Sequence, residues 1–215
     1  VDETTVFVNK DGRLAGSKSY MWLYRTVESV QKGQILLYEY QKTRNSNHPR
    51  TFLKSFHDIC ITDGYQVYHT LEQEREDLQI AGCWAHVRRR YDEALKALPK
   101  EKRNQSTAHR GLVMIQAIYR NEKPLKELSA EERRERRQLS AIPLVEAYFT
   151  WVHATIGQVM PKSKLWEGLN YSINQERYLK VFLENGNVPI DNNASERSIR
   201  SFCIGRKNFV MIDTL

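Results

Sequence analysis

The stretch Asp58-Ile59-Cys60-Ile61-Thr62-Asp63-Gly64 decides how this chain is organised. Its first five residues are mostly β-branched or apolar, and the Asp-Gly pair after them is a turn signal. We therefore predict a short buried strand over residues 58–62 that ends at Asp63. A helix that starts near Pro49 precedes it, and a strand reached through a helix runs parallel to an earlier strand of the same sheet.

Three further β-forming runs lie closer to the start of the chain, and the turn signals Asp11-Gly12 and Lys32-Gly33 separate them. The runs are Thr4–Val8, Tyr20–Tyr24 and Ile35–Tyr40. Short strands with such turns between them predict an antiparallel meander. The apolar residues Ile80–Cys83 predict a fifth strand, and we expect one mixed sheet from all five.

The rest of the chain has helical spacing almost throughout. A helix is predicted over residues 84–98, where Pro99 ends it. Helical patterns continue over about residues 105–184, and within them the run Glu131–Arg137 mixes charges of both signs, which predicts a solvated helix face. Asp191-Asn192-Asn193 opens a last helix. The predicted fold class is therefore α/β, with a long helical stretch late in the chain.

The composition indicates a globular protein with an excess of positive charge. Of 215 residues, 33 are Lys or Arg and 26 are Asp or Glu, so the formal net charge is +7. A basic balance suits a polyanion, because each neutralised phosphate releases counterions. Three widely spaced cysteines predict a reducing cytoplasm rather than a disulfide framework. No run predicts a membrane span, and the first residue, Val1, leads us to expect a piece of a longer protein.

Three carboxylates stand where predicted elements begin or end. Asp2 opens the first strand, Asp63 ends the fourth, and Glu196 lies in the first turns of the last helix. If the first and fourth strands are neighbours, Asp2 and Asp63 face each other across about 4.8 Å. Carboxylates this close repel unless cations compensate them, and hard oxygen ligands favour Mg²⁺ or Mn²⁺. A pair of such ions supports in-line displacement at phosphorus.

Each of these acids also has an ordinary structural explanation. An Asp63-Gly64 pair is typical of a plain turn, and an acid at position two is typical of a frayed end. Glu196 stands three residues after Asn193, which fits a capping box. Spacing alone favours these explanations over a site.

Six blocks of sequence add a different kind of evidence. They are Val1–Thr4, Ser19–Arg25, Thr62–Tyr65, Gly82–Arg89, Asn192–Ile199 and Ile204–Asn208. Together they resemble the insertion sequence 66 family of transposases. The blocks occur in the family's order and extend over nearly the whole chain.

The resemblance implies a fold, a ribonuclease H-like mixed sheet flanked by helices, with an all-helical insertion before the last helix. In that plan residues 1–104 are the first part of the ribonuclease H-like core and residues 105–185 are the helical insertion. Residues 186–215 are the last part of the core and carry the catalytic Glu. Since the family pattern tolerates other residues at Asp191, we expect Asp191 to cap the last helix.

The resemblance also implies an activity. The family's enzymes nick DNA phosphodiesters at transposon ends and join the freed 3′ hydroxyl to target DNA. By matching motifs, Asp2, Asp63 and Glu196 would be the catalytic and metal-binding residues, with two Mg²⁺ or Mn²⁺ ions. The expected partner is double-stranded DNA, bound by a homo-oligomer in the cytoplasm, associated with the nucleoid and without a membrane.

Further residues in these motifs are candidates for contact with DNA. His86 is expected either to touch DNA or orient a metal ligand, or to lie at the surface without a role, while Cys83 packs inside. The two do not predict a zinc site, because no second pair has a suitable spacing. Arginine binds phosphate through its planar fork, so a DNA channel is expected from the basic residues. They are Arg88, Arg89, Arg197, Arg200, Arg206 and Lys207, while Trp84, Trp151 and Trp166 are expected in the core.

Three other functions stay open at this level. One is a structure-selective nuclease of the same fold, such as a junction resolvase, which would cut DNA without joining it. Another is an inactive DNA-binding remnant, and a third is a helical interaction module over residues 105–184. Recognition of specific DNA ends is expected in other domains, because the chain has no helix-turn-helix or zinc-finger pattern.

Overall fold

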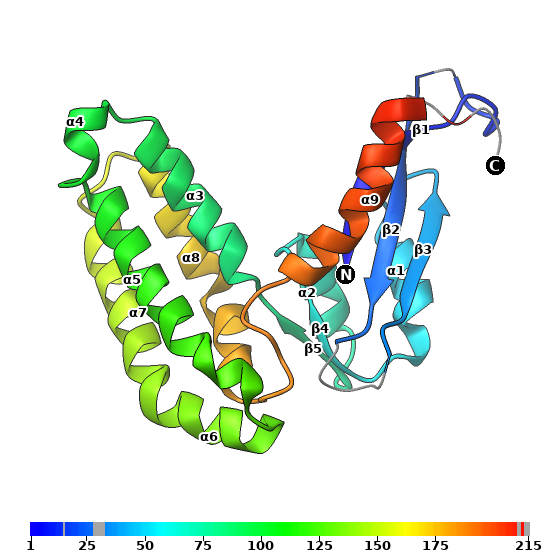
Figure 1. Ribbon diagram of the computed structural model, residues 1–215. Helices are drawn as coiled ribbons and strands as arrows, with labels where there is room; N and C mark the ends of the chain where they lie inside the picture. Colours follow the sequence, from blue (N-terminus) through cyan, green and yellow to red (C-terminus); the bar gives the residue numbers. More distant parts are fainter. Residues whose placement is uncertain (15, 28–32, 210–211, 213–215) are drawn as a thin grey trace. The chain divides into compact units, whose positions relative to one another are not determined.

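The computed structural model describes residues 1–14, 16–27, 33–209 and 212, apart from the side chains of residues 207 and 209. The chain divides into two compact units (Figure 1). The first unit combines Val1–Ile80 with Asn192–Leu215, and the second is Ala81–Asp191. The chain therefore leaves the first unit once and returns to it near its end.

The first unit contains the predicted meander. Strands β1 (Asp2–Phe7), β2 (Lys18–Arg25) and β3 (Leu36–Gln41) form an antiparallel sheet in that order (Figure 1). Val6 of β1 and the consecutive residues Trp22 and Leu23 of β2 are fully buried, so the core of the unit packs against these two strands. The meander is confirmed, although Lys32 of the second predicted turn lies outside the described residues.

The prediction of a single mixed sheet is wrong. Strands β4 (Asp58–Ile61) and β5 (Leu78–Ala81) form a second, two-stranded sheet. The nitrogen of Val1 donates a hydrogen bond to the carbonyl oxygen of Ile61 at 2.9 Å, so the start of β1 adjoins the end of β4. The start of β1 and the end of β4 therefore lie side by side, although the two strands belong to different sheets.

Among the residues of the first unit that the structure describes, three helices accompany the strands. Helix α1 (Asn47–Phe52), continued by the 3₁₀ turn η1 (Leu53–Ser55), is the helix expected before β4. Helix α2 (Gln66–Gln73), which the sequence did not predict, packs Tyr68 and Leu71 inside. Its Glu72 accepts a hydrogen bond from the backbone N–H of Ile80 at 2.8 Å. The last helix, α9 (Asn193–Phe209), carries Glu196 in its first turn.

The second unit is helical, as predicted. Helices α3, α5, α7 and α8 form a bundle in which each contacts two of the others. Helix α3 packs with the helical unit, whereas the sequence predicts it as part of the first core segment. The predicted domain boundaries at residues 104 and 185 stay predictions. The elements are α3 (Trp84–Lys96), α4 (Lys100–Arg103), α5 (Thr107–Glu122), η2 (Pro124–Glu127), α6 (Ala130–Ser140), α7 (Ile142–Ile156), α8 (Lys164–Lys180) and η3 (Val181–Leu183).

An aromatic cluster forms the centre of this bundle. The ring of Trp84 meets Tyr148 edge-on at 5.3 Å, and the hydroxyl of Tyr148 donates to that of Tyr91 at 3.1 Å. Trp84 and Trp151 are buried, as expected, whereas Trp166 is half-buried. Such edge-to-face pairs add to the stabilisation that burial of the rings provides.

The charged run on α6 is not the fully solvated face that its composition predicts. Arg137 is completely buried and forms an ion pair with the buried Glu122 of α5. Its Nη1 also donates to the carbonyl oxygens of Phe182 and Asn185, at 2.6 and 2.9 Å. One arginine therefore satisfies carbonyl groups at the end of η3, a contact that local charge balance does not reveal.

The two ends of the helical unit lie close together. The N–H of Trp84 donates to the carbonyl oxygen of Ile190 at 3.2 Å, and that of Gly82 to Tyr178 at 2.9 Å. Asp191 accepts a hydrogen bond from the Tyr119 hydroxyl at 2.9 Å. Helix α9 begins at Asn193, two residues after Asp191, and a capping role for Asp191 stays a prediction.

Candidate functional site

The three predicted acids all belong to the first unit. Asp2 is the first residue of β1, and Asp63 follows β4 by two residues. Glu196 lies in the first turn of α9, where its backbone N–H donates to the carbonyl oxygen of Asn192 at 3.1 Å. Each acid thus stands at an end of its own element, as the sequence predicts.

Val1 links the segments that carry the acids. Its nitrogen donates to Ile61 at the end of β4, and its carbonyl oxygen accepts a hydrogen bond from the side-chain Nδ2 of Asn192 at 2.7 Å. Asn192 is almost completely buried and directly precedes α9. The starts of β1 and α9 and the end of β4 therefore meet at one residue.

A tight turn holds Asp63. Its Oδ1 accepts a hydrogen bond from the backbone N–H of Tyr65 at 2.9 Å, the pattern of an Asx turn. Gly64 between them has a φ of +87°, a left-handed conformation that favours glycine. The Asp-Gly pair thus serves as a turn and also presents a carboxylate, so the two explanations of the motif are compatible.

The charges of the three acids interact. The pKa of Asp2 is raised to about 6, mainly because the side chain is buried; the charges of Asp63 and Glu196 add to the rise, whereas the Glu3 N–H and the Val1 ammonium oppose it. Like charges act on one another in this way only when they are close and poorly solvated. The structure therefore brings Asp2 into the electrostatic range of the other two acids.

A fourth acid, Glu3, belongs to the same neighbourhood and has no assigned role in the sequence analysis. Its side chain is 5% exposed and pairs with the guanidinium of Arg44. Burial, followed by the charge of Asp63, raises the pKa of Glu3 to about 7, although Arg44 lowers it. Glu3 was visible in the sequence as the neighbour of Asp2, but no pattern marked Arg44.

These pKa shifts predict how the metal-free fold responds to pH. Asp2 and Glu3 bind protons more tightly in the folded than in the unfolded chain, so their stabilising contribution is complete at low pH and is lost as pH rises. The loss falls between about pH 4 and pH 7. Asp2→Asn, which cannot ionise, should be more stable than the wild type above that window, by about 1–2 kcal/mol after allowance for partial solvation.

Urea unfolding in the presence of a chelator, at several pH values, measures this difference. The two proteins should have similar free energies of unfolding near pH 4.5 and diverge as pH rises. Parallel curves for the two proteins would mean that the Asp2 carboxylate is well solvated in the folded chain.

The donor set of this cluster suits a divalent cation. Carboxylate oxygens are the hard ligands that Mg²⁺ and Mn²⁺ prefer. The raised pKa of Asp2, caused partly by Asp63 and Glu196, indicates repulsion that a bound cation would relieve. The residues therefore fit the metal that the sequence analysis expects.

The outer end of α9 is anchored to β1. Nη1 of Arg206 donates to the hydroxyl oxygen of Thr4 at 3.0 Å and to the carbonyl oxygen of Thr5. This anchoring contributes to the placement of α9, and contact of Arg206 with DNA stays a prediction. Arg197 and Arg200 are exposed on the same helix, while the side chain of Lys207 lies outside the described residues.

The remaining candidates lie on α3 in the helical unit. Cys83 is buried directly before the helix, and His86 is half-buried in its first turn. Arg88 and Arg89 are exposed, which is compatible with the expected contact with phosphate. The burial of Cys83 agrees with a packing role.

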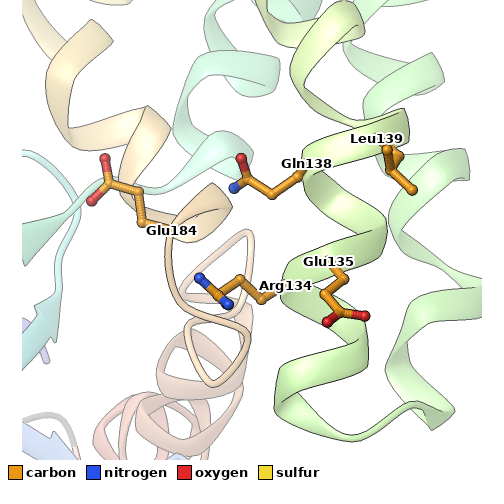
Figure 2. A pocket seen from close by; sticks show the side chains of 5 residues that line it. All are labelled: Arg134, Glu135, Gln138, Leu139 and Glu184. Atoms are coloured by element: carbon orange, nitrogen blue, oxygen red, sulfur yellow. The ribbon is translucent and has the colours of Figure 1, made fainter.

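A pocket of about 560 Å³ opens on the helical unit (Figure 2). Two of its polar side chains are engaged: Arg134 pairs with Glu131 at 2.6 Å, and Gln138 donates to Leu183 at 2.8 Å. These two side chains therefore take part in the packing of the helical unit itself. It is lined by Arg134, Glu135, Gln138, Leu139 and Glu184, none of them a predicted site residue.

Comparison with known proteins identifies the class of protein to which the chain belongs. A family model that describes transposases matches residues 1–215, the whole chain. That model is the Transposase IS66 family, and the chain belongs to this family.

Two relatives come from Sinorhizobium fredii. Uncharacterized protein y4qI is 30% identical over 217 residues, which cover 96% of this chain and 39% of the relative. Uncharacterized protein y4jD is 25% identical over 219 residues, which cover 98% of this chain and 42% of the relative. The chain thus spans about two fifths of the length of these relatives. No solved structure matches the chain. Within the residues that the structure describes, no helix has both the length and the apolar character needed to cross a membrane.

Proposed function

We propose that this chain is the catalytic core of a DNA transposase with a ribonuclease H-like fold. It would cut phosphodiesters at transposon ends and join the freed 3′ hydroxyl to target DNA. The observation that carries the proposal is the meeting of the three acid-bearing segments at Val1. Family membership and the order of the elements support the same conclusion.

In this proposal Asp2, Asp63 and Glu196 hold two Mg²⁺ or Mn²⁺ ions. Bound divalent ions supply the charge that activates an attacking oxygen and stabilises a leaving oxygen in phosphoryl transfer. The chain's own task would be to hold the three carboxylates in position around the ions. Asn192 and the Asp63 turn serve that task, because each fixes the backbone beside an acid.

Double-stranded DNA is the proposed substrate, and the exposed arginines supply its phosphate contacts. Arg197 follows Glu196 on α9, and Arg200 lies one turn further on. Planar guanidinium groups bind two phosphate oxygens at once. Binding through phosphate should weaken linearly as the logarithm of the salt concentration rises. A homo-oligomer on two DNA ends is part of the proposal by analogy with the family.

The test is cleavage and joining by the purified protein. Duplexes that carry the terminus of the encoding element are incubated with Mg²⁺ or with a chelator, alongside duplexes already cut at that terminus. We expect Mg²⁺-dependent nicks that leave a 3′ hydroxyl, and joining of pre-cut ends to target DNA. Cleavage that persists in the chelator would contradict the proposal, and cleavage without joining would identify a nuclease.

Two variants separate a specific site from an effect of charge. Glu196→Gln removes one acid of the cluster, whereas Glu76→Gln removes an acid from the exposed surface of the same unit. Glu76→Gln should cut DNA as the wild type does, and Glu196→Gln should lose activity. Equal activity of both variants would exclude Glu196 from catalysis.

A further inference from the structure

Arg44 is the first link between Glu3 and the turn that carries Asp63. Its Nε donates to Oε1 of Glu3 at 2.8 Å, and its Nη2 contacts the same oxygen. The Glu3 side chain is 5% exposed and that of Arg44 is 39% exposed. A carboxylate so deeply buried is costly unless it is paired, so the ion pair fixes both side chains.

The same guanidinium contacts an aromatic ring. Its Cζ lies 3.8 Å from the centroid of the Tyr65 ring, where the negative face of the ring attracts a cation. The Tyr65 hydroxyl also donates to the backbone carbonyl oxygen of Arg44 at 3.0 Å. Two independent contacts therefore hold Tyr65 against Arg44.

Tyr65 is in turn bound to Asp63. Its backbone N–H donates to Oδ1 of Asp63 at 2.9 Å, across the left-handed Gly64. A continuous path of contacts thus leads from Glu3 through Arg44 and Tyr65 to the Asp63 carboxylate. Every contact on this path lies within the first unit.

We propose that Arg44 is a positioning residue for the Asp63 carboxylate. By holding Tyr65 in place, Arg44 keeps the N–H of Tyr65 on Oδ1 and so fixes the orientation in which Asp63 meets a cation. The inference rests on the proposed function, because that function assigns Asp63 to the cation site. Arginine is required because its planar fork bonds to a carboxylate and stacks on a ring at the same time.

Arg44→Lys tests this role without a change of charge. Lysine cannot form the fork or the planar stack, so the Asp63 turn should loosen. We expect the purified chain, without DNA, to bind Mn²⁺ about 10-fold more weakly, the scale of loss found when an outer partner of a metal ligand is removed. Calorimetry or the electron paramagnetic resonance signal of free Mn²⁺ measures the dissociation constant.

Arg50→Lys is the matched control. Arg50 also grips a single carboxylate, with its Nε and Nη2 at 2.9 and 2.8 Å from Glu74. Its side chain is 38% exposed, nearly the same as that of Arg44. If Arg44 only stabilised the fold, the two variants would bind Mn²⁺ alike. We expect Arg50→Lys to bind Mn²⁺ within about twofold of the wild type, because an exposed pair remote from the ligands has little effect on them.

Tyr65→Leu gives a second, independent arm. It keeps every charge and removes the ring under Arg44, so it should weaken Mn²⁺ binding to a similar extent. If Arg44→Lys fails to fold, as judged by circular dichroism, Tyr65→Leu decides the question alone. Folded variants that bind Mn²⁺ as tightly as the wild type would overturn the inference. A wild-type chain that binds no Mn²⁺ would instead overturn the proposed function, so the failure of the proposed function and the failure of the inference give different results.

Discussion

Asp63→Asn is expected to abolish binding of divalent cations while it leaves the fold intact. The amide oxygen of asparagine can still accept the hydrogen bond from the Tyr65 N–H, so the turn after β4 should persist. The substitution removes one negative charge and one anionic ligand without a change of volume. We expect Mn²⁺ affinity to fall by more than about 100-fold, beyond the loss caused by an outer partner alone.

Cation binding to the purified chain, with Mn²⁺ or Ca²⁺, measures this effect. Glu76→Gln controls for net charge, since it removes an exposed acid from the same unit. Thermal unfolding in a chelator checks the fold, and Asp63→Asn should be at least as stable as the wild type because Asp2 and Glu3 lose a repulsive neighbour. Unchanged affinity in Asp63→Asn would move the cation site elsewhere.

The largest effect on stability is expected for Arg137→Met in the helical unit. Methionine has a similar volume but leaves Glu122 buried without its counter-charge. It also removes the Nη1 donor from the carbonyl oxygens of Phe182 and Asn185. Breaking a buried pair from one side costs about 3–5 kcal/mol, because an uncompensated charge remains inside.

Urea unfolding, followed by the fluorescence of tryptophans in the helical unit, measures this cost. Arg134→Met is the matched control: it lies on the same helix, but its partner Glu131 is exposed, so the cost should stay below about 1 kcal/mol. The double variant Arg137→Met with Glu122→Met should recover part of the loss, since no charge is then left buried. Equal costs for Arg137→Met and Arg134→Met would show that the buried pair contributes nothing to stability.

The strands were predictable because each run carries its own signal. Residues 20–24 are aromatic or apolar throughout, which is typical of a strand, so local chemistry determines the element. Helix α2 was missed because it is only eight residues long and mixes polar with apolar side chains. The separation into two sheets depends on where β1 starts relative to the end of β4, which no local pattern contains.

The buried Arg137 shows a second limit of sequence analysis. Residues 131–137 mix acids and bases, as is typical of a solvated helix, and Arg134 does pair with Glu131 on the surface. Arg137 differs only because Glu122 and the end of η3 lie against it in the folded unit. Partners 15 and 45 residues away decided its environment.

The candidate site also combines residues that the sequence marks with residues that it does not mark. The positions of Asp2, Asp63 and Glu196 at the ends of elements were predictable from local patterns, while their role in a site stays a prediction. The raised pKa of Asp2 comes mainly from its burial, which the sequence does not reveal. Arg44 was not predictable: its contact with Glu3 spans 41 residues and belongs to no motif. A residue that positions a metal ligand is defined by its contacts in the folded chain, so the sequence alone does not identify it.

The adjoining ends of the helical unit have an evolutionary consequence. Because the N–H of Trp84 bonds to Ile190, the polypeptide departs and re-enters at nearly the same point. An excursion of this kind resembles a long surface loop, which accepts insertions and deletions readily. We therefore expect gain or loss of helical turns within this unit to leave the strands of the first unit undisturbed, because only the two adjoining ends of the unit continue into them.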